Sequence, residues 1–409
     1  MKRNLSKSTS VARLILVVWL MFGSQAPSIA GSLSPSTYRQ LASIRELIHQ
    51  QSYDEALSAL DLLLDTVGER AYERAVVLQT LGYVQIGREA YPAAIQAFEQ
   101  SLALEQLPGE TQQRMRYGLA QLFLSTGKTT RAIDLLELWF TQETQADASA
   151  YLLLGYAYAQ NKQYREAVPA LQTAIKLSKE PHADWYETLL AIHYELRSYK
   201  ACIPLLKDMI RLFPGRQRYW QQLAGIHLAL NDQDAAITAL ELALRDGALT
   251  REPELTRLAQ LYLYSGIPYK AARLLENGIK TGEVGNNAEH RRLLAHAWSA
   301  AGEREQAIHA LEKAIVADSS PELRLQLAQW YFDEERWQAA ENILNAVTIQ
   351  QENTRINAQG WLLLGIARFE QGKTLAAHEA FNKASQLPDV KDMAHQWLQF
   401  IDTLPKDKV

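Results

Sequence analysis

Hydrophobic and small residues recur along this chain at spacings that do not change from one unit to the next. Nine times a leucine is followed seventeen residues later by a leucine or phenylalanine, with an alanine or cysteine four residues before that second position. The nine leucines, used here as reference positions, are Leu81, Leu119, Leu154, Leu189, Leu223, Leu258, Leu294, Leu327 and Leu364. Their partners are Phe98, Leu136, Leu171, Leu206, Leu240, Leu275, Leu311, Leu344 and Phe381. The small residues are Ala94, Ala132, Ala167, Cys202, Ala236, Ala271, Ala307, Ala340 and Ala377. Reference leucines are 33 to 38 residues apart, which predicts an array of two-helix units.

The residue after the reference leucine is also small in eight of the nine units. Two helices approach to about 8–10 Å only where little side chain stands between them. We therefore expect the small positions of both helices to meet at the crossing of each unit. The eight residues are Gly82, Ala120, Gly155, Ala224, Ala259, Ala295, Ala328 and Gly365, and Leu190 is the exception.

Glycine or asparagine follows the first helix of several units, where a left-handed capping residue is needed. The unit around Lys162 has no such residue, so the turn signal supports the array without defining it. The predicted capping residues are Gly127, Asn231, Gly266, Gly302 and Gly372.

These units resemble the tetratricopeptide repeat (TPR) family, whose 34-residue unit is a helix–turn–helix. The best matching unit carries Tyr151, Leu154, Gly155, Tyr158, Tyr164, Ala167, Leu171 and Ala174, and the last one carries Trp361, Leu364, Gly365, Ala377, Phe381, Ala384 and Pro388. The resemblance implies an all-α, right-handed superhelical solenoid of about ten repeats over residues 37–391. The first unit is degenerate, with Ser43 at its reference position, as suits a terminal repeat. Residues 392–409 are expected to form a capping helix and a short tail.

The first thirty residues have a different composition from the repeats. Lys2, Arg3, Lys7 and Arg13 precede the apolar run 14–22, and the segment ends in the small-residue pattern 28–30. This order predicts a secretory signal peptide that is cleaved after Ala30. The apolar run is shorter than the roughly 20 residues of a membrane span, so we expect no stable span after cleavage. An uncleaved anchor is the alternative.

Charge and cysteine content exclude several classes of function. Removing the predicted signal leaves 38 of the 42 basic residues against 46 acidic ones, a net charge of −8. Nucleic-acid binding is disfavoured because phosphate recognition needs clustered positive charge. The one cysteine, Cys202, excludes a disulfide framework, and we interpret it as a small buried side chain.

Motifs for catalysis, metals and cofactors are missing or incomplete in the sequence. The segments 127–129 and 372–374 read Gly-Lys-Thr, but both lack the upstream glycine of a phosphate-binding loop. His290 and His296 are six residues apart, which does not place them on one helix face. We therefore predict no enzyme activity and no cofactor, and we expect the acidic run 333–335 to lie in a turn.

In the TPR family the first helices line the concave face, so positions two before, two after and five after the reference leucine are candidates for partner binding. This face is rich in Tyr and Gln in its N-terminal half and more apolar near its C-terminal end. Tyr combines an apolar ring with a polar tip, a frequent combination at interfaces. Packing between neighbouring first helices is the alternative role for these tyrosines. The candidate groove residues are Tyr83, Tyr117, Gln121, Tyr156, Tyr194, Gln221, Gln260, Arg292, His296 and Gln329.

The overall pattern resembles a group of gammaproteobacterial periplasmic TPR proteins that are described as components of the TonB system. The cues are a short signal, the Ser-x-x-Thr-Tyr-Arg-x-Leu stretch around Tyr38, about ten repeats and a terminal helix containing Trp397. The resemblance implies a periplasmic, Gram-negative scaffold that works with TonB, ExbB and ExbD in outer-membrane transport. A scaffold for assembly of a pilus or an exopolysaccharide exporter is an alternative. An envelope enzyme bearing repeats is an alternative of another class, for which residues 37–404 leave no catalytic domain.

Overall fold

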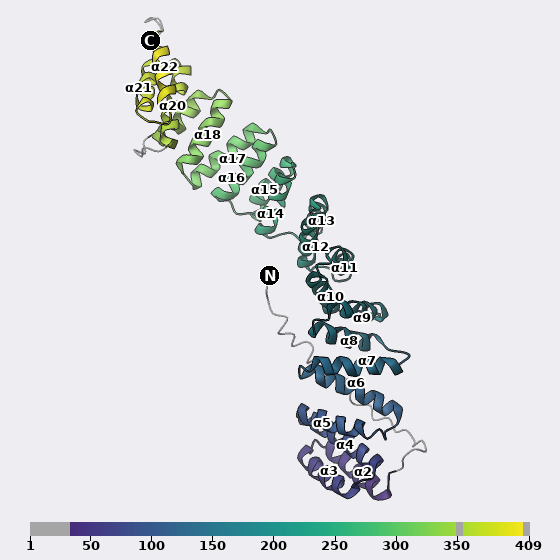
Figure 1. The fold of residues 1–409 in the computed structure, drawn as a ribbon. Helices are drawn as coiled ribbons and strands as arrows, with labels where there is room; N and C mark the ends of the chain where they lie inside the picture. The colour runs from purple at the N-terminus through teal and green to yellow at the C-terminus, as the bar shows by residue number, and fades with distance from the viewer. Residues whose placement is uncertain (1–32, 349–354, 404–409) are drawn as a thin grey trace. The chain divides into compact units, whose positions relative to one another are not determined.

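The computed structural model describes residues 33–348 and 355–403, and these residues form 21 helices and no strand (Figure 1). The predicted signal segment, residues 1–30, lies outside the described residues. Within the described ranges, no helix is long and apolar enough to cross a membrane. The all-helical repeat fold expected from the sequence is therefore confirmed.

The chain divides into two compact units, residues 1–209 and 210–409, and the boundary falls within helix α11. The first unit contains α2 (Pro35–His49), α3 (Tyr53–Val67), α4 (Ala71–Gly87), α5 (Tyr91–Ala103), α6 (Gly109–Ser125), α7 (Thr129–Gln142), α8 (Ala148–Gln160), α9 (Tyr164–Leu177), α10 (Ala183–Glu195) and most of α11 (Tyr199–Leu212). We call this the N-terminal unit.

The second unit, called the C-terminal unit below, continues the same alternation of first and second helices. It contains α12 (Gln217–Ala229), α13 (Gln233–Arg245), α14 (Glu252–Tyr264), α15 (Pro268–Thr281), α16 (Ala288–Ala300), α17 (Arg304–Ala317), α18 (Pro321–Asp333), α19 (Trp337–Thr348), α20 (Arg355–Glu370) and α21 (Thr374–Ser385). The last helix, α22 (Lys391–Asp402), packs on α21 where a capping helix was expected.

The small residues lie at the helix crossings, as their spacing predicts. All nine small residues of the second helices are 0% exposed, and so is Ala56 of the degenerate first repeat. The partner positions seventeen residues after the reference leucines are all buried as well. The reference leucines are buried in seven units, whereas Leu81 and Leu154 are only partly buried.

Glycine after the reference leucine makes room for the side chain of the second helix. A Cβ on Gly82 would lie 2.4 Å from the Phe98 ring, and one on Gly365 would lie 2.5 Å from the Phe381 ring. Such a contact is far inside van der Waals distance. Both units with phenylalanine at the partner position therefore carry glycine opposite it.

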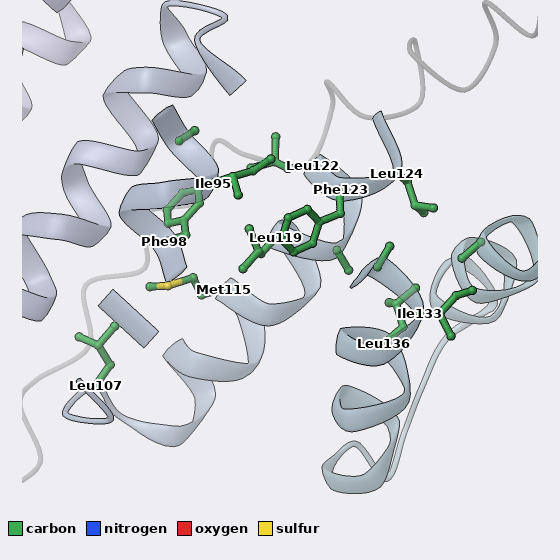
Figure 2. Packing of buried hydrophobic residues seen from close by; sticks show 14 of the residues in the cluster. Ile95, Phe98, Leu107, Met115, Leu119, Leu122, Phe123, Leu124, Ile133 and Leu136 are labelled. Atoms are coloured by element: carbon green, nitrogen blue, oxygen red, sulfur yellow. The ribbon is translucent and has the colours of Figure 1, made fainter. Parts of the chain in front are cut away.

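Within each compact unit, helices of consecutive repeats also pack on one another, as α5 does on α6 and α15 on α16. Figure 2 shows Met115 and Leu119 of α6 near Phe98 of α5, and Leu136 of α7 on the other side. Because every repeat buries apolar surface only against its neighbours, no central core is needed.

All ten turns between first and second helices have the same backbone geometry. In each, one residue adopts a left-handed conformation, its N–H bonds the carbonyl three residues back, and the next N–H bonds the carbonyl five residues back. This pattern of capping bonds satisfies the last carbonyls of the first helix. The left-handed residues are Gln51, Glu89, Gly127, Lys162, Arg197, Asn231, Gly266, Gly302, Glu335 and Gly372.

Candidate functional site

The candidate binding surface consists of the first-helix positions two before, two after and five after each reference leucine. We call it the first-helix face and describe it separately for each unit. In the N-terminal unit it includes Tyr83 of α4, Tyr117 and Gln121 of α6, Tyr156 of α8 and Tyr194 of α10. In the C-terminal unit it includes Gln221 of α12, Gln260 of α14, Arg292 and His296 of α16, and Gln329 of α18.

The first three tyrosines of the N-terminal face are half-buried, and two of them, Tyr83 and Tyr117, pack on other aromatic rings. Tyr83 makes an edge-to-face contact with Phe98 at a centroid distance of 5.2 Å, and its hydroxyl accepts a bond from the Gln79 amide at 3.3 Å. Tyr117 lies 5.2 Å from the ring of Trp139. These rings therefore contribute to packing, and each leaves only part of its surface for a partner.

The hydroxyl groups of these tyrosines stay protonated at neutral pH. Burial raises the pKa of Tyr117 to about 12, and the nearby carboxylate of Asp147 adds to the effect. Burial likewise raises the pKa of Tyr156 to about 12, with the Asp184 carboxylate as a further cause. Both phenols can consequently donate a hydrogen bond to a carbonyl group of a partner.

Tyr194 differs from the other tyrosines of this face because it is 40% exposed. Its ring contacts the Tyr199 ring edge-to-face at 5.6 Å, which orients it without covering it. Gln121 is half-buried in the preceding part of the face. Tyr194 is therefore the most accessible of the four predicted tyrosines.

The predicted residues of the C-terminal unit are mostly open to solvent. Gln260, Arg292, His296 and Gln329 are all exposed. Gln221 is the exception, since it is half-buried and donates to the Glu254 carboxylate, which joins α12 to α14. Four polar side chains of this unit are thus free to meet a partner.

Farther along the C-terminal unit, the same positions become apolar, as the sequence predicts. Phe332, Ile366 and Phe369 are half-buried, and Leu325 and Leu362 are buried between neighbouring first helices. Phe332 also contacts the Trp337 ring at 5.1 Å. The face therefore changes from polar to aromatic and aliphatic toward the last repeat.

The described residues include no cluster of side chains suited to binding a metal ion. They contain no group of three or more His, Cys, Asp or Glu side chains that could hold a metal ion. Burial raises the pKa of the Cys202 thiol to about 11, so the thiol is not activated. Gly127 and Gly372, from the Gly-Lys-Thr segments, are left-handed turn residues with ordinary capping roles.

A tyrosine–glutamate pairing between consecutive repeats was not anticipated from the sequence. In three repeats, a tyrosine lies four residues after the reference leucine. Its hydroxyl donates to a glutamate of the preceding repeat, which lies eighteen residues after that repeat's reference leucine. The bonds are Tyr158 to Glu137 at 2.6 Å, Tyr262 to Glu241 at 2.7 Å, and Tyr331 to Glu312. Every repeat that has tyrosine four residues after its reference leucine follows a repeat that has glutamate eighteen residues after its own. The pairing could therefore have been found by comparing neighbouring repeats.

Comparison with known proteins identifies the repeats. A tetratricopeptide repeat family model matches residues 80–148, 117–180 and 152–215, and a second such model matches residues 217–245. A search of curated proteins finds no match.

Several solved structures of repeat proteins align with part of the chain. A crystal structure of MamA protein is 22% identical, covers 42% of this chain and 92% of its own, and has a TM-score of 0.36. MamA from Desulfovibrio magneticus RS-1 is 20% identical, with coverages of 45% and 99% and a TM-score of 0.37. YrrB, described as a TPR protein with an unusual peptide-binding site, is 13% identical, with coverages of 46% and 92% and a TM-score of 0.36. At these scores the similarities carry no argument about function.

Proposed function

Because this chain is built from tetratricopeptide repeats, we propose that it is a non-catalytic scaffold whose first-helix face holds an extended segment of a protein partner. We further propose that it acts in the periplasm of a Gram-negative bacterium as an accessory component of TonB–ExbB–ExbD transport. TPR proteins in general mediate interactions between proteins. The location and the partners are the narrower part of the proposal.

The exposed polar side chains of the first-helix face are the observation that carries the proposal. Gln260, His296 and Gln329 lie at the same position of three successive repeats, two residues after the reference leucine, and all three are exposed. Amide side chains can both donate to and accept from a peptide backbone. A row of such groups at a constant position suits an extended chain that passes from repeat to repeat.

The spacing of the repeats is compatible with such a segment. Packed helices are about 8–10 Å apart, and an extended chain advances about 3.3 Å per residue. About three residues of the partner would therefore span the distance between two packed helices, and a segment of roughly ten residues would span about three such distances.

The periplasmic and TonB parts of the proposal are supported by the sequence. The basic-then-apolar segment 1–30 has the order of a secretory signal. The stretch around Tyr38 and the Trp-containing last helix carry the resemblance to the gammaproteobacterial group. A periplasmic scaffold would meet its partners after export.

Site-specific photo-crosslinking in intact cells tests both parts. A benzophenone amino acid would replace Gln260 or Gln329 on the first-helix face, and a matched control would replace Gln96, an exposed residue of second helix α5. We expect protein adducts from the two face positions and none from the control. Adducts that contain TonB, ExbB or ExbD would support the narrower proposal.

The possible negative results separate the two parts. Adducts with a different envelope protein would contradict the TonB assignment and leave the binding face in place. Equal adducts from all three positions, or adducts from position 96 alone, would contradict the first-helix face as the binding surface.

A further inference from the structure

The outward side of the last helix, α22, is unusually apolar for the end of a repeat array. The outer faces of helices at the ends of repeat arrays are normally polar, which keeps such proteins soluble. Met393 and Phe400, seven residues apart on α22, are each 48% exposed. Ala394 and Ile401, also seven apart, are buried and form the inward side. Helix α22 therefore has a second apolar stripe that the described residues leave about half exposed.

Phe400 is the outer member of an aromatic cluster at the end of the C-terminal unit. Trp397 stacks on Phe381 with an interplanar angle of 5° and a centroid distance of 5.3 Å. Phe369 lies 5.5 Å from Trp397 and 5.7 Å from Phe400. The inner rings hold Phe400 in place, so its exposed edge belongs to a preformed surface and not to a loose side chain.

A further exposed apolar side chain lies on the neighbouring helix. Leu375, in the first turn of α21, is 71% exposed. One turn farther along α21, the His378 imidazole lies 3.8 Å from the Asp402 carboxylate at the end of α22. Leu375 and Phe400 thus belong to adjoining ends of two packed helices. Exposed apolar groups gathered at one end of a fold are typical of interaction sites.

Two exposed carboxylates stand beside the aromatic part of this surface. Phe369 is followed by Glu370, and Asp402 stands two residues after Phe400; both carboxylates are exposed. The nearby cations Arg368 and Lys373 are already bound to Glu341, at 3.0 and 2.7 Å. Within the described residues, neither Glu370 nor Asp402 has a Lys or Arg partner.

Helix direction adds to the negative potential at the same place. Helices α20 and α22 end at Glu370 and Asp402, and the contact between Phe369 and Phe400 brings these two ends together. The C-terminus of a helix carries a partial negative charge and favours cations. Aromatic rings also attract Lys and Arg side chains through their faces.

We propose that the end of the C-terminal unit, formed by Leu375, Met393, Trp397, Phe400 and the carboxylates Glu370 and Asp402, is a docking surface for a protein segment that combines apolar side chains with Lys or Arg. The exposed stripe receives the apolar side chains, and the two carboxylates receive the cations. This surface is separate from the polar part of the first-helix face, and the proposal does not depend on the function proposed above.

Charge decides against two other occupants. A second copy of the chain docking through the same surface would place Glu370 and Asp402 against their own counterparts, and like charges repel at short distance. An anionic membrane would be repelled by the same carboxylates. A basic protein segment is the occupant that matches both the apolar and the charged groups.

Peptide binding to the full-length protein tests the proposal. The probe is a synthetic amphipathic helix of about 16 residues, with leucines on one face and lysines on the other; its counterpart has glutamate in place of lysine. We expect the lysine peptide to bind at least about tenfold more tightly than the glutamate peptide. The variant with Met393→Ser and Phe400→Ser is expected to lose at least about tenfold in affinity.

Three controls make the result interpretable. Val316→Ser removes an apolar side chain that is 89% exposed on α17, and it should leave binding unchanged. Glu370→Gln with Asp402→Asn should weaken the lysine peptide more at low than at high ionic strength. Circular dichroism should show that each variant keeps the helical content of the parent protein.

Several outcomes would overturn the proposal. These are equal binding of both peptides, no binding of the lysine peptide, or equal losses from Val316→Ser and the Met393/Phe400 variant. Self-association of the parent protein that the Met393/Phe400 variant abolishes would identify a second copy as the occupant. Flotation with anionic vesicles that the same variant abolishes would identify a lipid surface.

Discussion

The N-terminal and C-terminal units have the same kind of helix crossing in their interiors and differ on their first-helix faces. In the N-terminal unit, Tyr83, Tyr117 and Tyr156 are half-buried and engaged with neighbouring side chains. In the C-terminal unit, Gln260 and His296 stand exposed, and the face ends in an aromatic cluster at α22. The helix crossings beneath both faces have the same fully buried small residues.

The comparison shows that side-chain size is restricted at the helix crossing and that side-chain type differs on the first-helix face. The crossing tolerates only small side chains, because the partner Leu or Phe fills the space. The face carries no such restriction, so it can favour packing in one unit and exposure in the other. Specificity for a partner is therefore expected to come from the face, and stability from the crossing.

The largest effect is expected from overpacking a crossing in either unit. Ala167→Trp and Ala340→Trp should each lower the free energy of unfolding by about 3 kcal/mol, because neither 0%-exposed site can accept an indole without moving a helix. Hydrogen exchange of the helices around each site is the measurement, since long arrays need not unfold in one step. Similar losses of protection in both units would confirm that their helix crossings are packed in the same way. Unchanged exchange would contradict the register of the repeats.

A buried glutamate of the C-terminal unit, Glu341, is held by several bonds. Glu341 accepts bonds from Arg368, Gln371 and Lys373 at 3.0, 3.1 and 2.7 Å. Burial raises the pKa of Glu341, but these bonds together outweigh it and hold the pKa below its ordinary value. Glu341→Gln should cost about 2 kcal/mol at neutral pH, since it leaves the cations without their carboxylate.

The pH dependence of this loss follows from the lowered pKa. The contribution of Glu341 is fully present above its unfolded pKa, about 4.3, and is lost as the pH falls through the lower folded pKa. Stability curves of the parent and of Glu341→Gln should therefore converge in acid. A constant difference down to the lowest pH would show that the loss comes from packing instead.

The two faces can be compared directly by removing polar groups. A triple variant removes only hydroxyl groups from the N-terminal face: Tyr83→Phe, Tyr117→Phe and Tyr156→Phe. We expect its binding free energy for the partner to weaken by about 1 kcal/mol while helical content is unchanged. Gln260→Ala with Gln329→Ala is the matched change in the C-terminal unit. Partner capture is the readout. Full capture by both variants would contradict the assigned face, and loss in one alone would tell which unit binds.

The smallest expected effect lies in the turns, where five residues other than Gly or Asn are left-handed. Lys162 has a φ of 60°. Lys162→Gly should raise the free energy of unfolding by about 0.5 kcal/mol, because glycine adopts this conformation without a Cβ clash. Gly127→Ala, at φ of 75°, is the matched change in the opposite direction and should destabilise. Chemical denaturation is the measurement. A higher free energy of unfolding for Lys162→Gly and a lower one for Gly127→Ala would confirm that the two turns share one geometry.

The fold could be predicted in detail because the crossing has a strict steric requirement. The constant spacing of the reference leucine, the small residue and the partner Leu or Phe is enough to locate both helices, and the buried Cys202 occupies the small position as the alanines do. Glycine and asparagine marked five of the turns. The other five, including those at Glu89 and Arg197, were not marked, because packing on both sides of the turn imposes a conformation that the local residues do not favour.

The candidate site was less predictable than the fold. Helical phase placed Gln260 and His296 on first helices, where they are exposed. Phase alone could not tell that Tyr117 would pack against Trp139, because that contact depends on the next helix. The bond between Tyr158 and Glu137 also joins two repeats, and a search within single repeats does not reveal it.

Cysteine accessibility tests the central claim most directly, since Cys202 shows that this fold accepts a thiol at the small crossing position. In a Cys202→Ala background, single cysteines would replace Ala94, Ala271 or Ala307 at the crossing, and Gln260, His296 or Gln329 on the face. Maleimide labelling of the native protein should be fast at the three face positions and at least about a hundredfold slower at the three crossing positions, where labelling requires local opening of the helices. Fast labelling at the crossing positions would contradict the repeat register on which the whole account depends.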